Sequence, residues 1–201
     1  RIALTVAENR APYFVEVSGS FAVGIGKMAL SFFWLFFFGA IILFYDAIKH
    51  FEDRNKAILA VAFIIFMIGS IFSRIAPGSL LNGENFISNF IYFGSFFVMA
   101  AATVYVSVKE KASLQNNFHK ISFSYLLVLS MIFFAIISMR GAVRLFFIIS
   151  PVLIIAASFL PVKLFEISYY KKERFAAIAL ISLAIIAILL ALLIAFKYSQ
   201  Q

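Results

Sequence analysis

Six long stretches of uncharged, mainly apolar residues follow one another along the chain, and the charges lie in the segments between them. Each stretch is close to the ~17–25 residues that cross a hydrocarbon core of ~30 Å as a helix. In lipid the backbone must satisfy its own hydrogen bonds, and the apolar–polar alternation of β-barrel strands is absent. The pattern therefore predicts an all-α integral membrane protein of about six transmembrane helices, at 28–48, 57–75, 86–108, 121–139, 142–164 and 175–196.

The composition excludes a water-soluble domain. Hydrophobic residues make up 64% of the chain, charged residues only 13%, and the mean hydropathy is +1.05. A soluble domain has roughly a quarter charged residues, so this chain has too little polar surface to cover its exterior. Cysteine is absent, which excludes disulfides and thiolate metal sites. His50 and His119 are too few and too far apart to suggest a ligand cluster.

The net charge of +8 is better explained by membrane topology than by nucleic acid, because the basic residues lie between the apolar stretches. Ten of them crowd into three alternate loops, which we expect to be cytoplasmic, and seven lie on the other side. We therefore predict a multi-pass protein of the cell membrane with both termini extracytoplasmic and no nucleic-acid partner. The ten are Lys49, Arg54, Lys56, Lys109, Lys111, Lys120, Lys163, Lys171, Lys172 and Arg174.

Two regions are expected, an extracytoplasmic loop at 1–22 and a transmembrane helical domain at 23–201. Within the loop, residues 13–17 mix apolar and charged side chains as a short extended segment would. Gly69 with Ser73, and the alanines at 100–102, offer small faces for close helix packing. The chain begins with Arg1 and its last apolar stretch ends just before the terminus, so we expect it to be a piece of a longer protein.

Arg140 and Arg144 lie where one apolar stretch ends and the next begins. On a continuous helix this spacing would put both guanidinium groups on one side. Arginine at membrane depth is costly and usually has an anionic partner, and its planar fork matches phosphate oxygens. One interpretation is a clamp for phosphate or pyrophosphate at the outer membrane surface. The other is a pair of snorkelling anchors that only fix helix depth. The spacing leaves both open.

The carboxylates suggest chemistry less directly. Glu8, like Glu16 and Glu84, is consistent with a solvated loop charge, which is the usual state of a lone carboxylate. Asp46 and Glu166 lie near cytoplasmic helix ends and are interpreted as loop-side charges.

Two motifs together resemble a known family. Thr5-Val6-Ala7-Glu8 resembles the TIxE motif in external loop 5 of asparagine-linked oligosaccharyltransferase catalytic subunits, with Val6 in place of isoleucine. Gly141-Ala142-Val143-Arg144-Leu145, followed by an apolar run and Pro151-Val152, resembles the arginine-bearing helix of that family. The chain would be the second half of the transmembrane region. Asn9-Arg10-Ala11-Pro12 departs from the eukaryotic sequence after the glutamate, which favours a prokaryotic and, by its Phe/Ile/Lys-rich composition, an archaeal enzyme.

The resemblance implies a metal-dependent, inverting glycosyltransferase. An oligosaccharide would move from a dolichyl or polyprenyl (pyro)phosphate carrier to asparagine in an Asn-X-Ser/Thr sequence of an acceptor polypeptide. Glu8 would be catalytic, contacting the acceptor amide and helping to bind Mg²⁺ or Mn²⁺, and Arg144 would bind the lipid phosphate. Arg140 has no counterpart in the motif and stays a candidate from its position alone. The acidic motifs of the first loops and the WWDYG motif are missing, so this chain by itself is expected to be inactive.

Two alternatives remain. A transporter or flippase for lipid-linked sugars would hold phosphate with Arg140 and Arg144 without chemistry, although such proteins usually carry broken helices and polar residues at the membrane midplane. A non-catalytic membrane scaffold would keep all its charges at the interfaces. An acidic loop upstream in the parent protein would favour the transferase over both.

Overall fold

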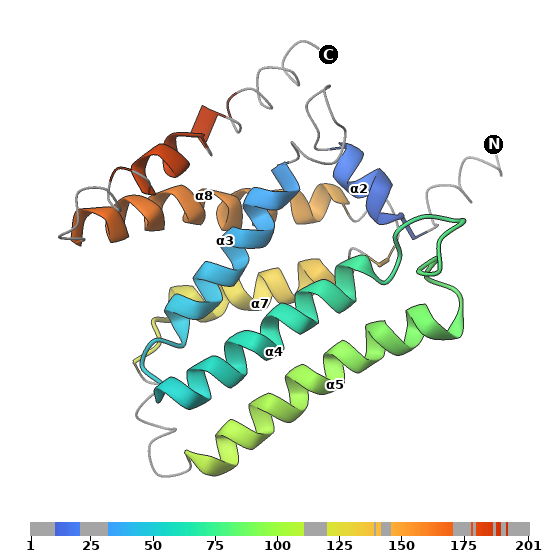
Figure 1. The fold of residues 1–201 in the computed structure, drawn as a ribbon, viewed down its shortest axis with the longest axis horizontal. Coiled ribbons are helices and arrows are strands. Elements are labelled where there is room, and N and C mark those ends of the chain that lie inside the picture. Colours follow the sequence, from blue (N-terminus) through green and yellow to red (C-terminus); the bar gives the residue numbers. More distant parts are fainter. Residues whose placement is uncertain are drawn as a thin grey trace.

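The computed structural model describes residues 11–20, 32–110, 120–138, 140–141 and 146–170, with positions 178, 180–186, 188, 189 and 192 beyond them. Over these residues the structure is helical and holds no β-strand, only an isolated bridge between Arg74 and Asn82. The labelled helices are α2 (Phe14–Ser20), α3 (Phe32–Ala47), α4 (Asp53–Phe72), α5 (Phe86–Lys109), α7 (Phe123–Ser138) and α8 (Phe146–Tyr170) (Figure 1).

Three of the described helices are long and apolar enough to cross a membrane. They are α4, α5 and the part of α8 from Pro151 to Tyr169. Two shorter apolar helical segments, Phe33–Ala47 and Phe123–Ser138, accompany them. The all-helical class and the capacity to span a membrane agree with the sequence analysis, whereas the count of six spans and the location of the termini stay predictions. The described positions from 178 to 192 are helical, as the stretch at 175–196 predicted.

Several helix ends differ from the expected ones because short charged segments join the helices. α4 begins at Asp53 rather than 57, and Lys56 pairs with Asp53 at 2.6 Å in its first turn. α8 continues to Tyr170 rather than 164, and Lys163 pairs with Glu166 one turn further along, at 2.8 Å. The start of α5 agrees with the prediction, because the side chain of Asn85 caps the helix by accepting from the Ser88 N–H at 2.8 Å.

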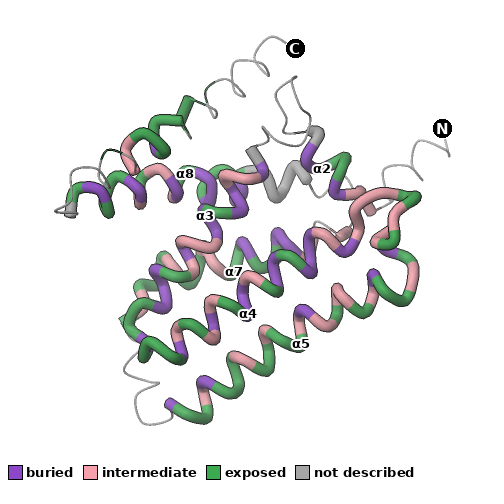
Figure 2. Tube along the Cα trace, in the orientation of Figure 1, coloured by how far each residue is buried: buried purple, intermediate pink, exposed green. Residues whose placement is uncertain are grey.

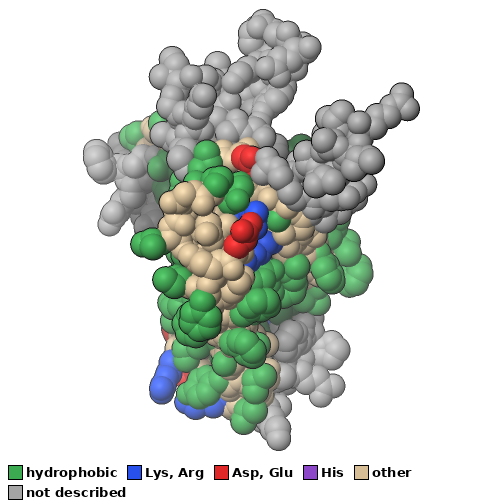
Figure 3. Space-filling view, turned by 90° about the vertical axis from the view of Figure 1, so that its right-hand side faces the viewer, with side chains coloured by type: hydrophobic (Ala, Val, Ile, Leu, Met, Phe, Trp, Pro, Cys, Tyr) green, Lys and Arg blue, Asp and Glu red, His purple; other side chains and the backbone are tan. Residues whose placement is uncertain are grey.

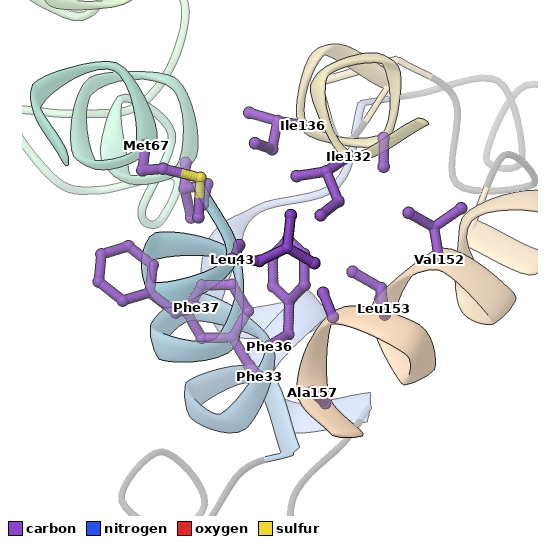
Figure 4. Close-up of a cluster of buried hydrophobic side chains, with 14 of the residues drawn as sticks. Phe33, Phe36, Phe37, Leu43, Met67, Ile132, Ile136, Val152, Leu153 and Ala157 are labelled. Atoms are coloured by element: carbon purple, nitrogen blue, oxygen red, sulfur yellow. The ribbon is translucent and has the colours of Figure 1, made fainter. Parts of the chain in front are cut away.

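The helices form two closely packed pairs that share one core. α4 lies along α5, and α3 packs against α8, while α7 contacts α3, α4 and α8 (Figure 1). The buried centre is filled by aromatic side chains of α3 against branched side chains of α7 and α8, with Met67 of α4 closing one side (Figure 4). Those labelled in Figure 4 include Phe33, Phe36, Phe37, Ile132, Ile136, Val152, Leu153 and Ala157.

Glycines set the two closest approaches. A Cβ on Gly39 of α3 would lie 1.9 Å from the carbonyl oxygen of Ala156 in α8. A Cβ on Gly69 of α4 would lie 2.4 Å from the Cβ of Ser95 in α5. The prediction of small-residue packing is thus confirmed at Gly69. The described structure shows no such packing at Ala100 and Ala101, because both residues are exposed on α5.

The outer surface of the bundle is apolar, as a lipid-facing surface requires. α5 is the most exposed of the long helices: half of the apolar window of α4 is buried, but only 17% of that of α5 (Figure 2). Large apolar side chains cover α5 along its length, among them Phe90, Phe97 and Val104. Burial inside the protein therefore accounts for little of the hydrophobicity of this helix.

Residues 14–20 correct one expectation. The mixture of apolar and charged residues at 13–17 predicted an extended part of a solvated loop, but the segment forms helix α2 and packs on the bundle. Phe14 is 4% exposed, and its ring centroid lies 5.1 Å from that of Phe33 and 4.6 Å from that of Phe72. Phe14 and Val17 are three residues apart and both buried, so they form one face of a helix rather than alternating as in a strand.

Candidate functional site

The sequence indicated three candidate residues, Glu8, Arg140 and Arg144, and the structure describes one of them. Glu8 and Arg144 lie outside the described residues, so the structure neither brings them together nor separates them. Arg140 is described, and it follows α7 in a turn rather than in a helix: its N–H donates to the Ile137 carbonyl at 3.2 Å, and that of Gly141 to Ser138 at 2.8 Å. The continuous helix considered for this region is therefore not present at Arg140.

The guanidinium group of Arg140 binds three acceptors that come from the loop and helix after α4. Nη2 donates to the carbonyl oxygen of Gly83 at 2.7 Å and to Oδ1 of Asn89 at 2.8 Å. Nη1 donates to Oγ of Ser73 at 3.3 Å. All three acceptors are neutral, and the group also lies 4.1 Å from the centroid of the Tyr92 ring, within cation–π distance.

These contacts give Arg140 a role that neither sequence interpretation included. The side chain ties the turn after α7 to the α4–α5 loop and to the first turns of α5, so it is a bound structural group rather than an anchor reaching for water. Burial lowers the pKa of Arg140, and the nearby charge of Arg74 lowers it further. An arginine stays protonated even so. The bundle therefore keeps a positive charge here, surrounded mainly by neutral groups.

Arg74 lies close to Arg140 and connects α2 to the same end of the bundle. Its carbonyl oxygen accepts from the Phe14 N–H at 2.7 Å, and its guanidinium carbon lies 4.4 Å from the Tyr13 ring centroid. Glu84 balances its charge at 3.5 Å. Figure 3 shows basic and acidic side chains meeting in one small area on this side of the molecule, with hydrophobic side chains around them.

The two arginines face one small cavity. It is bounded by Pro12, Phe14 and Val17 on one side and by Ser70, Ile71, Arg74 and Arg140 on the other, and its volume is about 20 Å³. A cavity of this size holds about one water molecule. The space between the two arginines and α2 therefore has no room for a phosphate group.

A second polar cluster, at the opposite ends of the helices, was missed by the sequence analysis. Lys163 of α8 pairs with Asp46 of α3 at 3.0 Å, and the hydroxyl of Tyr125 of α7 donates to the same carboxylate at 2.5 Å. Asp46 is 9% exposed, so its interpretation as a loop-side charge is wrong. Asp46 directly follows a long apolar run, and Lys163 directly follows another; that shared position was the available signal.

This cluster joins the ends of α3, α7 and α8, and its buried charges are paired as burial requires. A matching contact joins α4 to α5, where the Asn55 amide donates to the Glu110 carboxylate at 2.7 Å. Both contacts lie at helix ends, which points to a structural role. Within the described part of the chain, no group of three histidine, aspartate or glutamate side chains could hold a metal ion.

Comparison of the chain with protein-family models, with curated proteins and with solved structures finds no match. The resemblance to oligosaccharyltransferases therefore depends on the two sequence motifs alone.

Proposed function

We propose that this chain is part of a membrane glycosyltransferase that moves an oligosaccharide from a polyprenyl-type (pyro)phosphate carrier to asparagine of an acceptor protein. The two motifs carry the proposal, and one structural observation supports it. The described residues that adjoin the motifs, Pro12 and Arg140, line the same cavity although they are far apart in the sequence. Segments adjoining both motifs therefore meet at one end of the bundle.

The proposed chemistry is an inverting displacement at the anomeric carbon. The amide nitrogen of the acceptor asparagine attacks, the lipid phosphate leaves with the electron pair of the broken glycosidic bond, and the proton that the nitrogen loses passes to the departing phosphate. An amide nitrogen is a poor nucleophile because its lone pair is delocalised into the carbonyl. A carboxylate at Glu8 would accept a hydrogen bond from the amide N–H and weaken that delocalisation, and Arg144 would stabilise the charge that grows on the phosphate.

The family's divalent metal finds no site in the described residues, because no three of their histidine, aspartate and glutamate side chains lie together. Glu8 alone is one ligand, and a metal ion bound by oxygen needs several. We therefore derive no step through a metal. Arg140 has no counterpart in the motif and already binds three protein acceptors, so the proposal assigns the donor phosphate to Arg144.

Substitution of Glu8 in the full-length protein tests this function. Glu8→Gln keeps the size of the side chain but removes its negative charge, so transfer of glycan to a peptide containing Asn-X-Ser/Thr should fall to the background rate while the protein still folds. Glu16→Gln is the matched control. Glu16 accepts from the Tyr13 N–H at 3.0 Å at the start of α2, a contact that glutamine can keep. Equal transfer by both variants and the parent would refute the proposal.

A further inference from the structure

A wide apolar groove opens along α5 on the side that faces α7. α5 lines it from Tyr92 to Val104, α7 contributes Phe133 and Ile137, and its volume is about 730 Å³. The hydroxyl group of Thr103 does not make the groove polar, because it donates to the Met99 carbonyl of its own helix at 2.8 Å. From Phe93 to Val104 the groove can therefore hold a hydrocarbon chain without leaving a side-chain polar group unpaired.

The length of the groove matches one leaflet of a bilayer. The helix rises ~1.5 Å per residue, so the span from Tyr92 to Val104 is about 18 Å long. Half of a ~30 Å hydrocarbon core is about 15 Å. The groove is thus about as long as one lipid chain and shorter than the contact surface of a transmembrane helix. It lies along the middle of α5, so a chain that enters from the Tyr92 end would reach past the membrane midplane.

One end of the groove carries a positive charge. The ring of Tyr92 lines the groove, and the guanidinium carbon of Arg140 lies 4.1 Å from its centroid. The three protein acceptors of Arg140 are neutral, and among the described residues no carboxylate lies within ion-pair distance of it. An anion at this end would find an uncompensated cation next to an apolar channel.

We propose that the groove holds one apolar chain of an anionic membrane lipid whose phosphate group lies beside Arg140. The occupant is a resident lipid of the bilayer and not the glycan donor, so the inference does not rest on the proposed transferase activity. Arg140 has five N–H groups, of which the protein acceptors engage three, and a phosphate oxygen can accept from the others. The positive charge of Arg140 selects an anionic headgroup, and the groove holds the hydrocarbon chain of the lipid.

Quenching of a tryptophan in the groove tests the occupant. In the chain with its one tryptophan changed by Trp34→Phe, Phe97→Trp puts a reporter in the groove. Val98→Trp is the matched control, because Val98 is exposed at the same depth of α5 but does not line the groove. Each variant of this chain is placed in bilayers that contain brominated phosphatidylglycerol or brominated phosphatidylcholine. Phosphatidylglycerol should quench the groove reporter about five times as strongly as phosphatidylcholine does. The two lipids should quench the control equally.

Two further variants remove the charge in different ways. Arg140→Gln deletes it. Asn89→Asp keeps the shape of the residue and its acceptor, which lies 2.8 Å from Nη2 of Arg140, but supplies a carboxylate that neutralises the guanidinium. The second variant keeps all three acceptors of Arg140 and loses only the exposed hydrogen bond from the Asn89 amide to the Glu84 carbonyl, so it should fold even if the first does not. In both, the preference at the groove reporter should fall to about one.

Three outcomes would overturn the proposal. The first is equal quenching of the groove reporter by the two lipids in the otherwise unchanged chain. The second is little quenching by any lipid, which would mean that a second copy or another helix covers the groove. The third is displacement of the brominated lipid by polyprenyl phosphate at a far lower mole fraction than by phosphatidylglycerol, which would assign the groove to the donor.

Discussion

Arg140 acquires its role from residues that are more than fifty positions away in the sequence. Its acceptors, Ser73, Gly83 and Asn89, all belong to the segment between the end of α4 and the first turns of α5. The sequence shows only that an arginine lies between two apolar stretches, and that position fits a phosphate clamp and a membrane anchor equally well. The acceptors indicate a third, structural role, because a guanidinium group bound by three protein oxygens holds separate parts of the chain together.

Removal of Arg140 should destabilise the bundle. Arg140→Ala leaves the Gly83 carbonyl and the Asn89 side chain without their donor, and a buried polar group left unpaired costs about 1–3 kcal/mol. We expect thermal unfolding of the purified protein in detergent at a lower temperature, with a loss of about 2 kcal/mol. Arg54→Ala, at an exposed position near the start of α4, should unfold like the parent. An unchanged midpoint for Arg140→Ala would contradict the structural role.

Arg144 should behave differently from Arg140 if it binds the donor phosphate. In the full-length protein, Arg144→Ala should raise the donor concentration needed for half-maximal transfer by roughly ten- to a hundredfold, the range expected when a charge-assisted hydrogen bond is lost. The affinity for the acceptor peptide should change little. Arg144→Lys should restore only part of the loss, because lysine lacks the planar fork. Kinetics like those of the parent at low donor concentration would assign Arg144 to the membrane anchors.

At the scale of helices, the contact between α3 and α8 depends on a single missing side chain. The Cβ added by Gly39→Ala would lie 1.9 Å from the Ala156 carbonyl oxygen, and backbone atoms cannot move aside as a flexible side chain can. We expect a loss of stability of about 1–3 kcal/mol, the usual cost of overpacking, measured by unfolding in detergent. Gly94→Ala in α5 is the control: nothing lies within 4 Å of its Cβ position, so higher helix propensity should leave stability unchanged or raised.

Buried polar contacts at helix ends fix how the helices meet. Asp46 receives Lys163 from α8 and Tyr125 from α7, so one carboxylate joins three helices. In a membrane protein the hydrophobic effect does little to choose one helix neighbour over another, because lipid tails are as apolar as the side chains. Close glycine contacts and a few paired polar groups therefore decide the arrangement, and these are the features that apolar runs do not reveal.

At the scale of the whole molecule, the described basic residues separate between the two ends of the helices. Arg54, Lys109 and Lys163 lie near one set of ends, and Arg74 and Arg140 lie near the other. The loop asymmetry predicts that the first set of ends is cytoplasmic, and this orientation stays a prediction.

Cysteine labelling of intact cells tests the orientation, because the chain has no cysteine of its own. An impermeant thiol reagent should label Gly78→Cys from outside, and Arg54→Cys only after the membrane is opened. Both positions are exposed, and nothing surrounds the Cβ position of Gly78. Asn55 and Ser168 would be unsuitable, at 2% and 6% exposed. Labelling of Arg54→Cys alone from outside would mean that the orientation is reversed.

The sequence by itself determined the class of this protein and the approximate position of its helices. Long uncharged runs specify helices in lipid whatever their neighbours are, because the backbone must satisfy its hydrogen bonds within each segment. α5 agrees closely with its prediction because both of its ends are set by nearby residues, the Asn85 cap at its start and the charges after Lys109 at its end. The sequence also contained the two motifs on which the proposed activity depends.

Only the tertiary structure decided which residues meet. The docking of Phe14 of α2 on Phe72, the pairing of Asp46 with Lys163 and the acceptors of Arg140 all join residues that are dozens of positions apart. Such contacts follow from the packing of whole helices, which depends on shape and on the few polar groups that must find partners when water is excluded. From the sequence alone, a short helix or a lone charge beside an apolar run could contact several different partners. The packing of the helices selects one of them.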